Sequence, residues 1–284
     1  MLERKPSRTA VGAAGYRAAH QILDEGAVFS DPYACTILGE EAEAVIHRLS
    51  SSEHAPLRLF MAARSRFAED CLADAVSRGV RQAVVLGAGL DTLALRNPHV
   101  ALGVRMFEVD HPATQLWKLR RLQEAGFAIR ENVRFVAVDF ERDKLTQELA
   151  AADFDKKEPA FFIWLGVVPY LTRQTIADTL AEIVTLPSPE LVFDYSEPLD
   201  SYPPDKRAKI AALAAYTAAL GEPWLSHFQP REIAQLLAAH GLTEQNDLGQ
   251  LEIAVRYFGA DPATTSPSVG AHVLHARKNE TRPS

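Results

Sequence analysis

Regular alternation of apolar strands with helices is the feature that most constrains the fold of this chain. Between residues 82 and 195, helical segments separate the strand-like runs "QAVVLG", "VRMFEVD", "VRFVAVD", "AFFIWL" and "ELVFDY". Strands that alternate with helices at this spacing require right-handed crossovers and favour a parallel sheet with helices on both faces. The sequence therefore predicts an α/β fold with a doubly wound, Rossmann-like sheet.

The spacing of apolar residues also predicts the helices around this sheet. An amphipathic helix is expected over 56–79, a short one from Asp91, and others over 112–125, 142–151 and 173–185. Alanine-rich helices follow the fifth strand, and "LTEQNDL" and "AHVLHARK" are expected to form an antiparallel pair at the sheet edge. The segment "GADPATTSPSVG" between them is a loop by composition.

Composition narrows the classes of partner. The formal net charge is −7, which disfavours a nucleic-acid surface because phosphate binding needs clustered basic side chains. No run approaches the roughly 18 apolar residues of a membrane helix. The two cysteines, Cys35 and Cys71, lack the spacing of a zinc site or a disulfide framework. We expect a cytoplasmic protein without a metal, a membrane or a nucleic acid as partner.

A glycine turn leaves the first strand at Gly87, Ala88 and Gly89. Such a turn lets the backbone approach a ligand, and open parallel sheets bind ligands beyond the carboxyl ends of their strands. The dinucleotide fingerprint has a third glycine where this chain has Thr92, and Asp91 brings negative charge close to where a diphosphate would lie. These features predict a ligand without phosphates, held by the turn and Asp91.

Acidic residues end the next two strands. Glu108 and Asp110 follow the turn by about twenty residues, where an acid hydrogen-bonds ribose hydroxyls in nucleoside-binding sheets. Asp139 could accept a hydrogen bond from an adenine amino group, and Phe140 could lie on its ring. Each acid could instead cap the helix that follows it.

An arginine on an apolar stripe points to the remaining part of the ligand. Arg64 lies on the apolar face of the helix over 56–79, and a buried guanidinium is costly unless an anion meets it. That anion could be an internal aspartate or glutamate. S-adenosylmethionine would also provide it, since this nucleoside has no phosphate and ends in an amino acid whose carboxylate would satisfy Arg64.

Several motifs together resemble one family. They are "RTAVGAAGYRAAH", "DPYA", "AARSRF", "VVLGAGLDT", "FEVDHP", "VDF", "WLGVVPYLT" and "VFDY", which span most of residues 8 to 195. With these motifs the chain resembles the leucine carboxyl methyltransferase family, in particular its bacterial branch similar to polyketide O-methyltransferases. The resemblance implies a class I methyltransferase fold, a seven-stranded sheet whose last strand is antiparallel, and S-adenosylmethionine as methyl donor.

The resemblance also implies roles for residues already selected. Arg64 corresponds to the arginine that binds the cofactor carboxylate, Gly87 to the first turn glycine and Asp110 to the ribose acid. Asp139 and Phe140 correspond to the adenine-side pair. We expect one domain with an N-terminal helical extension (1–80), a cofactor-binding core (81–200), a helical lid (201–243) and terminal strands (244–278).

One position departs from the family pattern. Many members have a glutamate in a "W-L-A-E-G" run after the fourth strand, whereas this chain has "FIWLGVVPYL" with Leu165 at that position. A cofactor-contacting acid is thus absent there. This difference argues against transferring the leucine-carboxyl reaction itself.

Candidate substrate residues are expected near the same edge of the sheet as the cofactor residues. They are Tyr170, Tyr195 and His227, although both tyrosines also suit packing or a contact with the sulfonium cation. His111 stands at a helix start, where a surface position is the simpler interpretation. No residue is identified as a catalytic base.

A segment before the core completes the predicted site. It contains Arg17, Asp31 and Tyr33, and in the family such a segment closes over the cofactor. A solvated helix position is the alternative for Arg17.

Three functions stay open at this point. The first is methyl transfer from S-adenosylmethionine to an oxygen of a small molecule, by a monomer or homodimer. The others are a cofactor-binding protein without methyl transfer and an NAD(P)-dependent oxidoreductase, which Thr92 and Asp91 disfavour.

Overall fold

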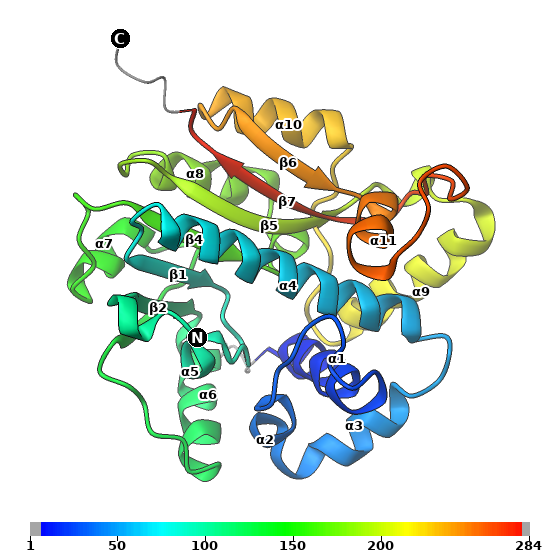
Figure 1. Cartoon of the computed structure of the whole chain (residues 1–284), viewed down its shortest axis with the longest axis horizontal. Helices are drawn as coiled ribbons and strands as arrows, with labels where there is room; N and C mark the ends of the chain where they lie inside the picture. Colours follow the sequence, from blue (N-terminus) through cyan, green and yellow to red (C-terminus); the bar gives the residue numbers. More distant parts are fainter. Residues whose placement is uncertain (1–6, 280–284) are drawn as a thin grey trace.

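A seven-stranded sheet forms the centre of the computed structural model, which describes residues 7–279 (Figure 1). The strands are β1 Gln82–Leu86, β2 Arg105–Asp110, β3 Val133–Ala137, β4 Ala160–Trp164, β5 Glu190–Ser196, β6 Glu244–Leu248 and β7 Ala271–Arg277. The helices are α1 Thr9–Leu23, α2 Ala34–Leu38, α3 Ala42–Arg48, α4 Ala55–Ser77, α5 Leu93–Arg96, α6 Pro112–Glu124, α7 Leu145–Ala151, α8 Arg173–Ile183, α9 Pro204–Ala219, α10 Pro230–Ala239 and α11 Gln250–Phe258.

The strand order confirms the predicted α/β fold. The order is β3-β2-β1-β4-β5-β7-β6, and β1 to β5 are all parallel. β7 runs antiparallel to both of its neighbours, so the antiparallel strand lies one place in from the edge that β6 forms. Because β1 to β5 are parallel, their carboxyl ends meet along one edge of the sheet.

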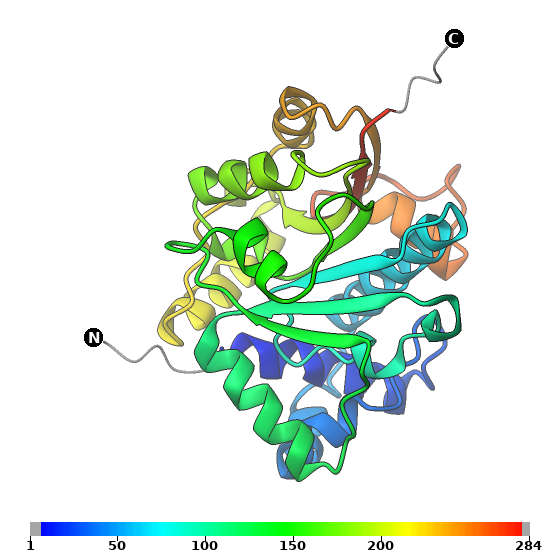
Figure 2. The same cartoon turned by 90° about the vertical axis from the view of Figure 1, so that its left-hand side faces the viewer.

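Helices cover both faces of this sheet, as the edge-on view in Figure 2 shows. Alternate residues of β1 point to opposite faces: Val84 packs in the apolar cluster that includes α7, α8 and α10, whereas Val85 packs in the one that includes α4 and α11. Every residue of β1 and β4 is buried. Burial on both faces explains why these strands read as continuous apolar runs.

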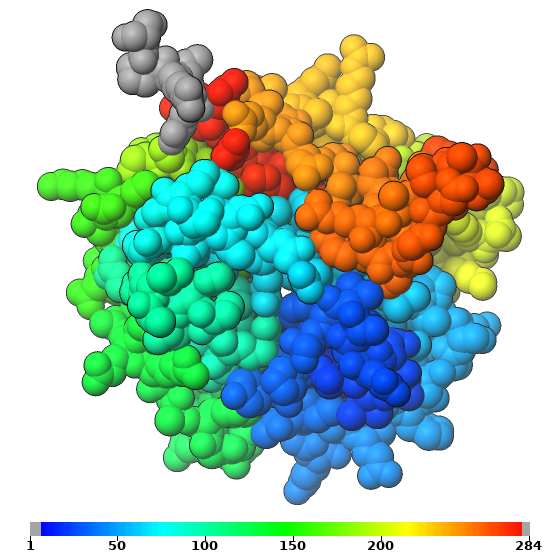
Figure 3. Space-filling view, in the orientation of Figure 1, coloured from blue at the N-terminus to red at the C-terminus, as the bar shows by residue number. Residues whose placement is uncertain are grey.

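The N-terminal helices form a third group beside the sheet. α1 contacts α2, α3 and α4, and in the space-filling view the dark blue N-terminal segment lies directly beside the lighter blue residues that lead into α4 (Figure 3). Ala14, Ala18 and Ile37 are at most 1% exposed in this group. The N-terminal helices therefore form a packed layer that contacts the rest of the protein through α4.

Two helices differ from the sequence prediction. α11 lies between β6 and the expected loop over 259–270, where no helix was expected, and Gly259 with φ of +68° caps its end. The apolar residues of "QLEIAVRYF" at helical spacing, with Ile253 buried, are the signal that could have identified it. α7 begins at Leu145 because residues 139–144 form a turn.

The described part of the chain contains no helix that is long and apolar enough to span a bilayer.

Removal of the Leu237 side chain tests the docking of α10. Leu237 is 0% exposed and packs against the sheet, so Leu237→Ala should lower the free energy of unfolding by about 2 to 5 kcal/mol. Leu116→Ala is the control, because Leu116 lies on α6 and is 52% exposed. Urea unfolding followed by circular dichroism should show a loss for Leu237→Ala only. An equal loss in both variants would contradict this packing.

Candidate functional site

The glycine turn after β1 is enclosed by two other parts of the chain. Gly87 and Gly89 have φ of +64° and +46°, where other residues are strained. A Cβ atom on Gly87 would overlap the side chain of Val167, and one on Gly89 would stand 3.0 Å from the Cβ of Ala10. Ala88 between them is 4% exposed. The turn is thus fitted between the loop after β4 and α1.

Asp110 lies at this turn, as the sequence predicted. Its carboxylate accepts hydrogen bonds from the backbone N–H of Gly89 at 2.6 Å and of His111 at 2.7 Å. Burial raises the pKa of Asp110, although these two bonds oppose the shift. His111 itself caps α6 by accepting from the N–H of Ala113. Asp110 therefore connects the ends of β1 and β2, and its bond to a ribose stays a prediction.

A buried polar network ties the N-terminal segment to the loop after the turn. Arg17 is 6% exposed, and it donates to Asp31 at 2.9 Å and to the carbonyl oxygen of Leu90 at 2.7 Å. Thr92 donates to the same Asp31 at 2.7 Å, and the backbone N–H of Tyr33 donates to it at 3.2 Å. The solvated position considered for Arg17 is wrong. The threonine hydroxyl at position 92 has a structural role that a glycine could not fill.

Asp91 is held as an anion beside the turn. It accepts from the N–H of Leu93 at 2.6 Å. Burial favours its neutral form, but the charges of Arg17, Arg96 and Lys118 hold the pKa of Asp91 below its ordinary value. Because like charges repel in a buried site, this carboxylate disfavours a diphosphate at the turn.

Arg64 of α4 reaches the carboxyl ends of β4 and β5. The side chain is 7% exposed, and its Nη1 donates to a carboxylate oxygen of Asp194 on β5. The backbone N–H of Gly166, just after β4, donates to the other oxygen of Asp194. A Cβ on Gly166 would stand 3.1 Å from Nη2 of Arg64. The internal acid that the sequence left open as a partner is Asp194.

One donor of Arg64 is left without a partner. Within residues 7–279 its buried Nε makes no hydrogen bond. A buried donor in this state is destabilising, and a carboxylate placed beside the guanidinium would satisfy it. The sequence analysis did not single out Asp194, although an aspartate inside the apolar run "LVFDY" is a signal of the same kind as Arg64.

Glu108 does not stand at the turn with Asp110. It forms an ion pair with Lys118 of α6 at 2.5 Å, and both side chains are 2% exposed. Burial raises the pKa of Glu108 to about 7, although the charge of Lys118 lowers it. We therefore assign Glu108 to this ion pair instead of to a ribose. The sequence analysis did not select Lys118. Its spacing of four residues from Leu122 places both side chains on the buried face of α6, which is the signal that could have identified it.

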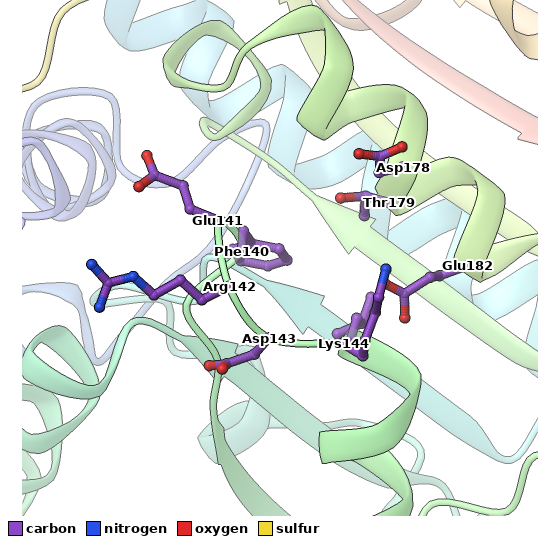
Figure 4. Close-up of a pocket in the computed structure, with 9 residues that line it drawn as sticks. Phe140, Glu141, Arg142, Asp143, Lys144, Asp178, Thr179 and Glu182 are labelled. Carbon is purple, nitrogen blue, oxygen red and sulfur yellow. The ribbon is translucent and has the colours of Figure 1, made fainter.

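Asp139 and Phe140 lie at the end of β3. One carboxylate oxygen of Asp139 accepts from the N–H of Glu141 at 3.1 Å, so the side chain closes its own turn. Phe140 packs against the apolar cluster on the α8 side and lines a hollow of about 110 Å³. In Figure 4, Arg142 from the same loop extends away from the α8 residues that line the other side of the hollow.

This hollow is smaller than a typical ligand pocket of roughly 300 to 1,000 Å³. It adjoins the predicted adenine side without enclosing a whole nucleoside. The predicted contacts of Asp139 and Phe140 with adenine are not tested by this geometry.

Tyr170 joins three parts of the chain. Its hydroxyl interacts with Trp224 of the segment between α9 and α10 and with Thr9 of α1, and both interactions favour the ionised phenol. Burial raises the pKa of Tyr170, which keeps the phenol neutral at pH 7. The backbone N–H of Thr9 also donates to Glu222 at 2.9 Å. Tyr170 therefore lies where the expected lid meets the N-terminal helix.

Tyr195 is a core residue, and its prediction as a substrate contact is wrong. The side chain is 1% exposed, stacks on the His272 ring at a centroid distance of 4.8 Å and donates to Asp247 at 2.6 Å. Burial first, and then the bond to Asp247, raises its pKa. Both faces of β5 are covered, so the tyrosine is buried whichever way it points.

His227 lies in the segment that covers the end of β5. Its Nδ1 is 3.1 Å from Oγ of Ser196, and its backbone oxygen accepts from Arg173 at 2.6 Å. Burial lowers the pKa of His227, so the imidazole is neutral at pH 7. The backbone N–H of Leu225 donates to the oxygen of Pro169 at 2.7 Å. These bonds hold residues 225–228 against the loop after β4.

Comparisons with known proteins identify the family of this chain. Residues 10–184 match the family model described as "Leucine carboxyl methyltransferase". YktD of Bacillus subtilis (strain 168), assigned as an S-adenosyl-L-methionine-dependent methyltransferase, is 28% identical over 307 aligned residues that cover 98% of this chain and 100% of YktD. A protein of Mycolicibacterium paratuberculosis with the same assignment is 34% identical over 201 residues, 66% of this chain and 74% of that protein.

Solved structures share the fold. A crystal structure from Thermobifida fusca YX, assigned as a methyltransferase, aligns with a TM-score of 0.61 and 18% identity over 97% of this chain and 96% of that one. A DUF574 family protein from Streptomyces avermitilis MA-4680 aligns with a TM-score of 0.54 and 18% identity over 93% and 97% of the two chains.

Replacement of Lys118 by methionine tests the buried ion pair. Lys118→Met leaves the Glu108 carboxylate buried without its cation, and we expect the free energy of unfolding to fall by about 3 to 5 kcal/mol at pH 8. The pKa of Glu108, already raised to about 7, rises further without the lysine. At pH 5.5 Glu108 is protonated in both folded proteins, so the extra cost of a carboxylate without its cation is absent there, and the loss of stability should be smaller than at pH 8.

Urea unfolding at the two pH values measures this difference. Lys157→Met, at an exposed lysine, is the control and should change little at either pH. A loss for Lys118→Met that is the same at pH 8 and pH 5.5 would show that the carboxyl does not titrate as described.

Proposed function

Because this chain belongs to the leucine carboxyl methyltransferase family, we propose that it transfers a methyl group from S-adenosylmethionine to a carboxylate or hydroxyl oxygen of a small molecule. Membership of the family makes the protein an S-adenosylmethionine-dependent methyltransferase. The same family membership favours methyl transfer over the NAD(P)-dependent oxidoreductase activity that the sequence left open. The oxygen acceptor and the small size of the substrate are our inference.

The observation that carries the proposal is the unpartnered Nε of Arg64. It is buried beside Gly166 at the carboxyl ends of the parallel strands, and among the described residues nothing accepts its hydrogen. The carboxylate at the amino-acid end of S-adenosylmethionine has the charge and the acceptor geometry that a guanidinium binds best. The residues at this edge of the sheet therefore fit the cofactor.

Other residues would hold the nucleoside end. The backbone of Gly87, Ala88 and Gly89 would face the nucleoside, and Asp110, which lies against this turn, would accept from ribose hydroxyls. Asp139 and Phe140 follow β3 beside it, on the adenine side. In this assignment Asp91 supplies negative charge near the turn, which suits a cationic ligand.

The cofactor, when bound, supplies an electrophilic methyl group on a sulfonium. The protein's part in an in-line displacement is to align the two reactants and to exclude water. The segment between α9 and α10 does this through the bonds of Leu225 to Pro169 and of Glu222 to Thr9. These bonds place a wall over the edge where the transfer would occur.

The acceptor decides whether a base is needed. A carboxylate attacks as the anion and needs none, whereas a hydroxyl gains from a base nearby. His227 is neutral at pH 7, because burial lowers its pKa, and can accept a proton. Tyr170 cannot, because its raised pKa keeps it protonated. His227 is therefore the residue that we propose as base for a hydroxyl acceptor.

Binding of S-adenosylhomocysteine, the demethylated product, tests the cofactor site. Calorimetric titration should show one-to-one binding with a micromolar Kd, and no binding of NAD. Asp110→Asn should weaken this binding by about 1 to 3 kcal/mol, the scale for loss of a charge-assisted hydrogen bond. Asp261→Asn, at an exposed loop position far along the chain, is the matched control and should bind like the wild type.

Incubation with labelled S-adenosylmethionine and a panel of small acids and phenols tests the transfer. A labelled product that releases methanol in base is a methyl ester, and one that resists base is an ether. Binding without transfer to any member of the panel would favour the cofactor-binding protein that the sequence left open. Absence of binding, in protein shown to be free of trapped cofactor, would remove the proposal.

A further inference from the structure

We propose that Asp194 binds the ammonium group at the amino-acid end of the cofactor, next to the carboxylate bound by Arg64. This inference rests on the proposed function, since it adds a residue to the same site. The amino-acid end carries a carboxylate and an ammonium group on one carbon atom. A pair of opposite charges on the protein, side by side at the edge of the sheet, is the arrangement that complements it.

The positions of the two side chains support this assignment. Arg64 comes from α4 and Asp194 from β5, and they meet where the parallel strands end, beside Gly166. The loop that contains Gly166 continues to Val167, whose side chain lies against Gly87 of the glycine turn. The charged pair and the turn are therefore neighbours across the ends of β1 and β4.

The hydrogen-bonding capacity of the pair leaves room for a ligand. An ionised carboxylate has about four lone-pair positions, and Asp194 uses one oxygen for Arg64 and the other for the N–H of Gly166. Each oxygen keeps capacity for an ammonium donor. Arg64 keeps its unpartnered Nε for a carboxylate. A zwitterion can thus bind while the contact between the two side chains persists.

The neighbouring position on β4 cannot provide this charge. Leu165 follows β4 and packs in the apolar cluster on the α4 side, the side from which Arg64 reaches Asp194. The register pairs Trp164 with Phe193, so Leu165 and Asp194 are the next residues on adjacent strands. The carboxylate that the sequence analysis found absent at 165 is supplied in our proposal one strand away.

Glycine at position 166 is part of the same arrangement. Gly166 has φ of +71°, and any Cβ there would stand 3.1 Å from Nη2 and 3.3 Å from Nη1 of Arg64. The absence of a side chain lets the guanidinium approach the end of β4. The backbone N–H of Gly166 also donates to Asp194 and so orients its carboxylate.

Three ligands separate the roles of the two side chains. S-adenosylhomocysteine has both charged groups, S-adenosyl-3-thiopropylamine lacks the carboxylate, and S-adenosyl-4-thiobutyrate lacks the ammonium. Asp194→Asn keeps an acceptor for Gly166 but removes the charge. Its Kd should rise about tenfold to a hundredfold for the first two ligands and stay within about threefold for the third.

Arg64→Gln should give the converse pattern. Its Kd should rise for S-adenosylhomocysteine and for the thiobutyrate, and stay close to the wild-type value for the amine. Glu197→Gln is the matched control, because Glu197 follows β5 three residues after Asp194 and lies beside His272. It should bind all three ligands like the wild type. Melting temperatures report whether each variant is folded.

The outcomes separate this inference from the proposed function. If the wild type binds none of the ligands, the proposed function fails. If Asp194→Asn binds the amine as tightly as the wild type does, Asp194 acts only by orienting Arg64 and the inference is overturned. Tighter binding of S-adenosylhomocysteine by Asp194→Asn would also overturn it, because Asp194 would then compete with the cofactor carboxylate for the guanidinium.

Discussion

The carboxylate of Asp31 connects the two halves of the site. It accepts from Arg17 of α1 and from Thr92 of the loop after β1, and it has no exposed side-chain surface. An anion in such a position needs a full set of donors. Because those donors come from separate elements, the N-terminal helix and the glycine turn are placed relative to each other. This placement also fixes α1, whose Thr9 donates to Glu222 of the segment between α9 and α10.

Buried charge pairs recur along the same side of the sheet. Glu108 pairs with Lys118 below the end of β2, and Arg64 pairs with Asp194 at the end of β5. The two pairs differ in where they lie. Lys118 of α6 meets Glu108 within β2, whereas Arg64 meets Asp194 beside Gly166, where the parallel strands end. Burial alone therefore does not identify a ligand site. What distinguishes Arg64 is that its unpartnered Nε lies at the carboxyl ends of the strands.

Features set by local pattern could be predicted from the sequence. The runs in β1 to β5 and the position of Arg64 on an apolar stripe depend on periodicity, and both predictions agree with the structure. Features set by tertiary partners could not. Neither the bond from Thr92 to Asp31, 61 residues apart, nor the pairing of Glu108 with Lys118 has a local signature. The sequence also could not predict which face of the sheet the Tyr195 side chain lies on, because a strand covered on both faces shows no alternation of polar and apolar residues.

The contact between Thr9 and Glu222 has a consequence for how the protein is made. The two residues are 213 positions apart in the chain, and synthesis proceeds from the N-terminus. α1 therefore leaves the ribosome long before the segment that completes its surroundings. β7, which lies between β5 and β6, emerges later still. The contact between α1 and the segment before α10 is thus among the last to form on a nascent chain, and until then α1 has its contacts with α2, α3 and α4.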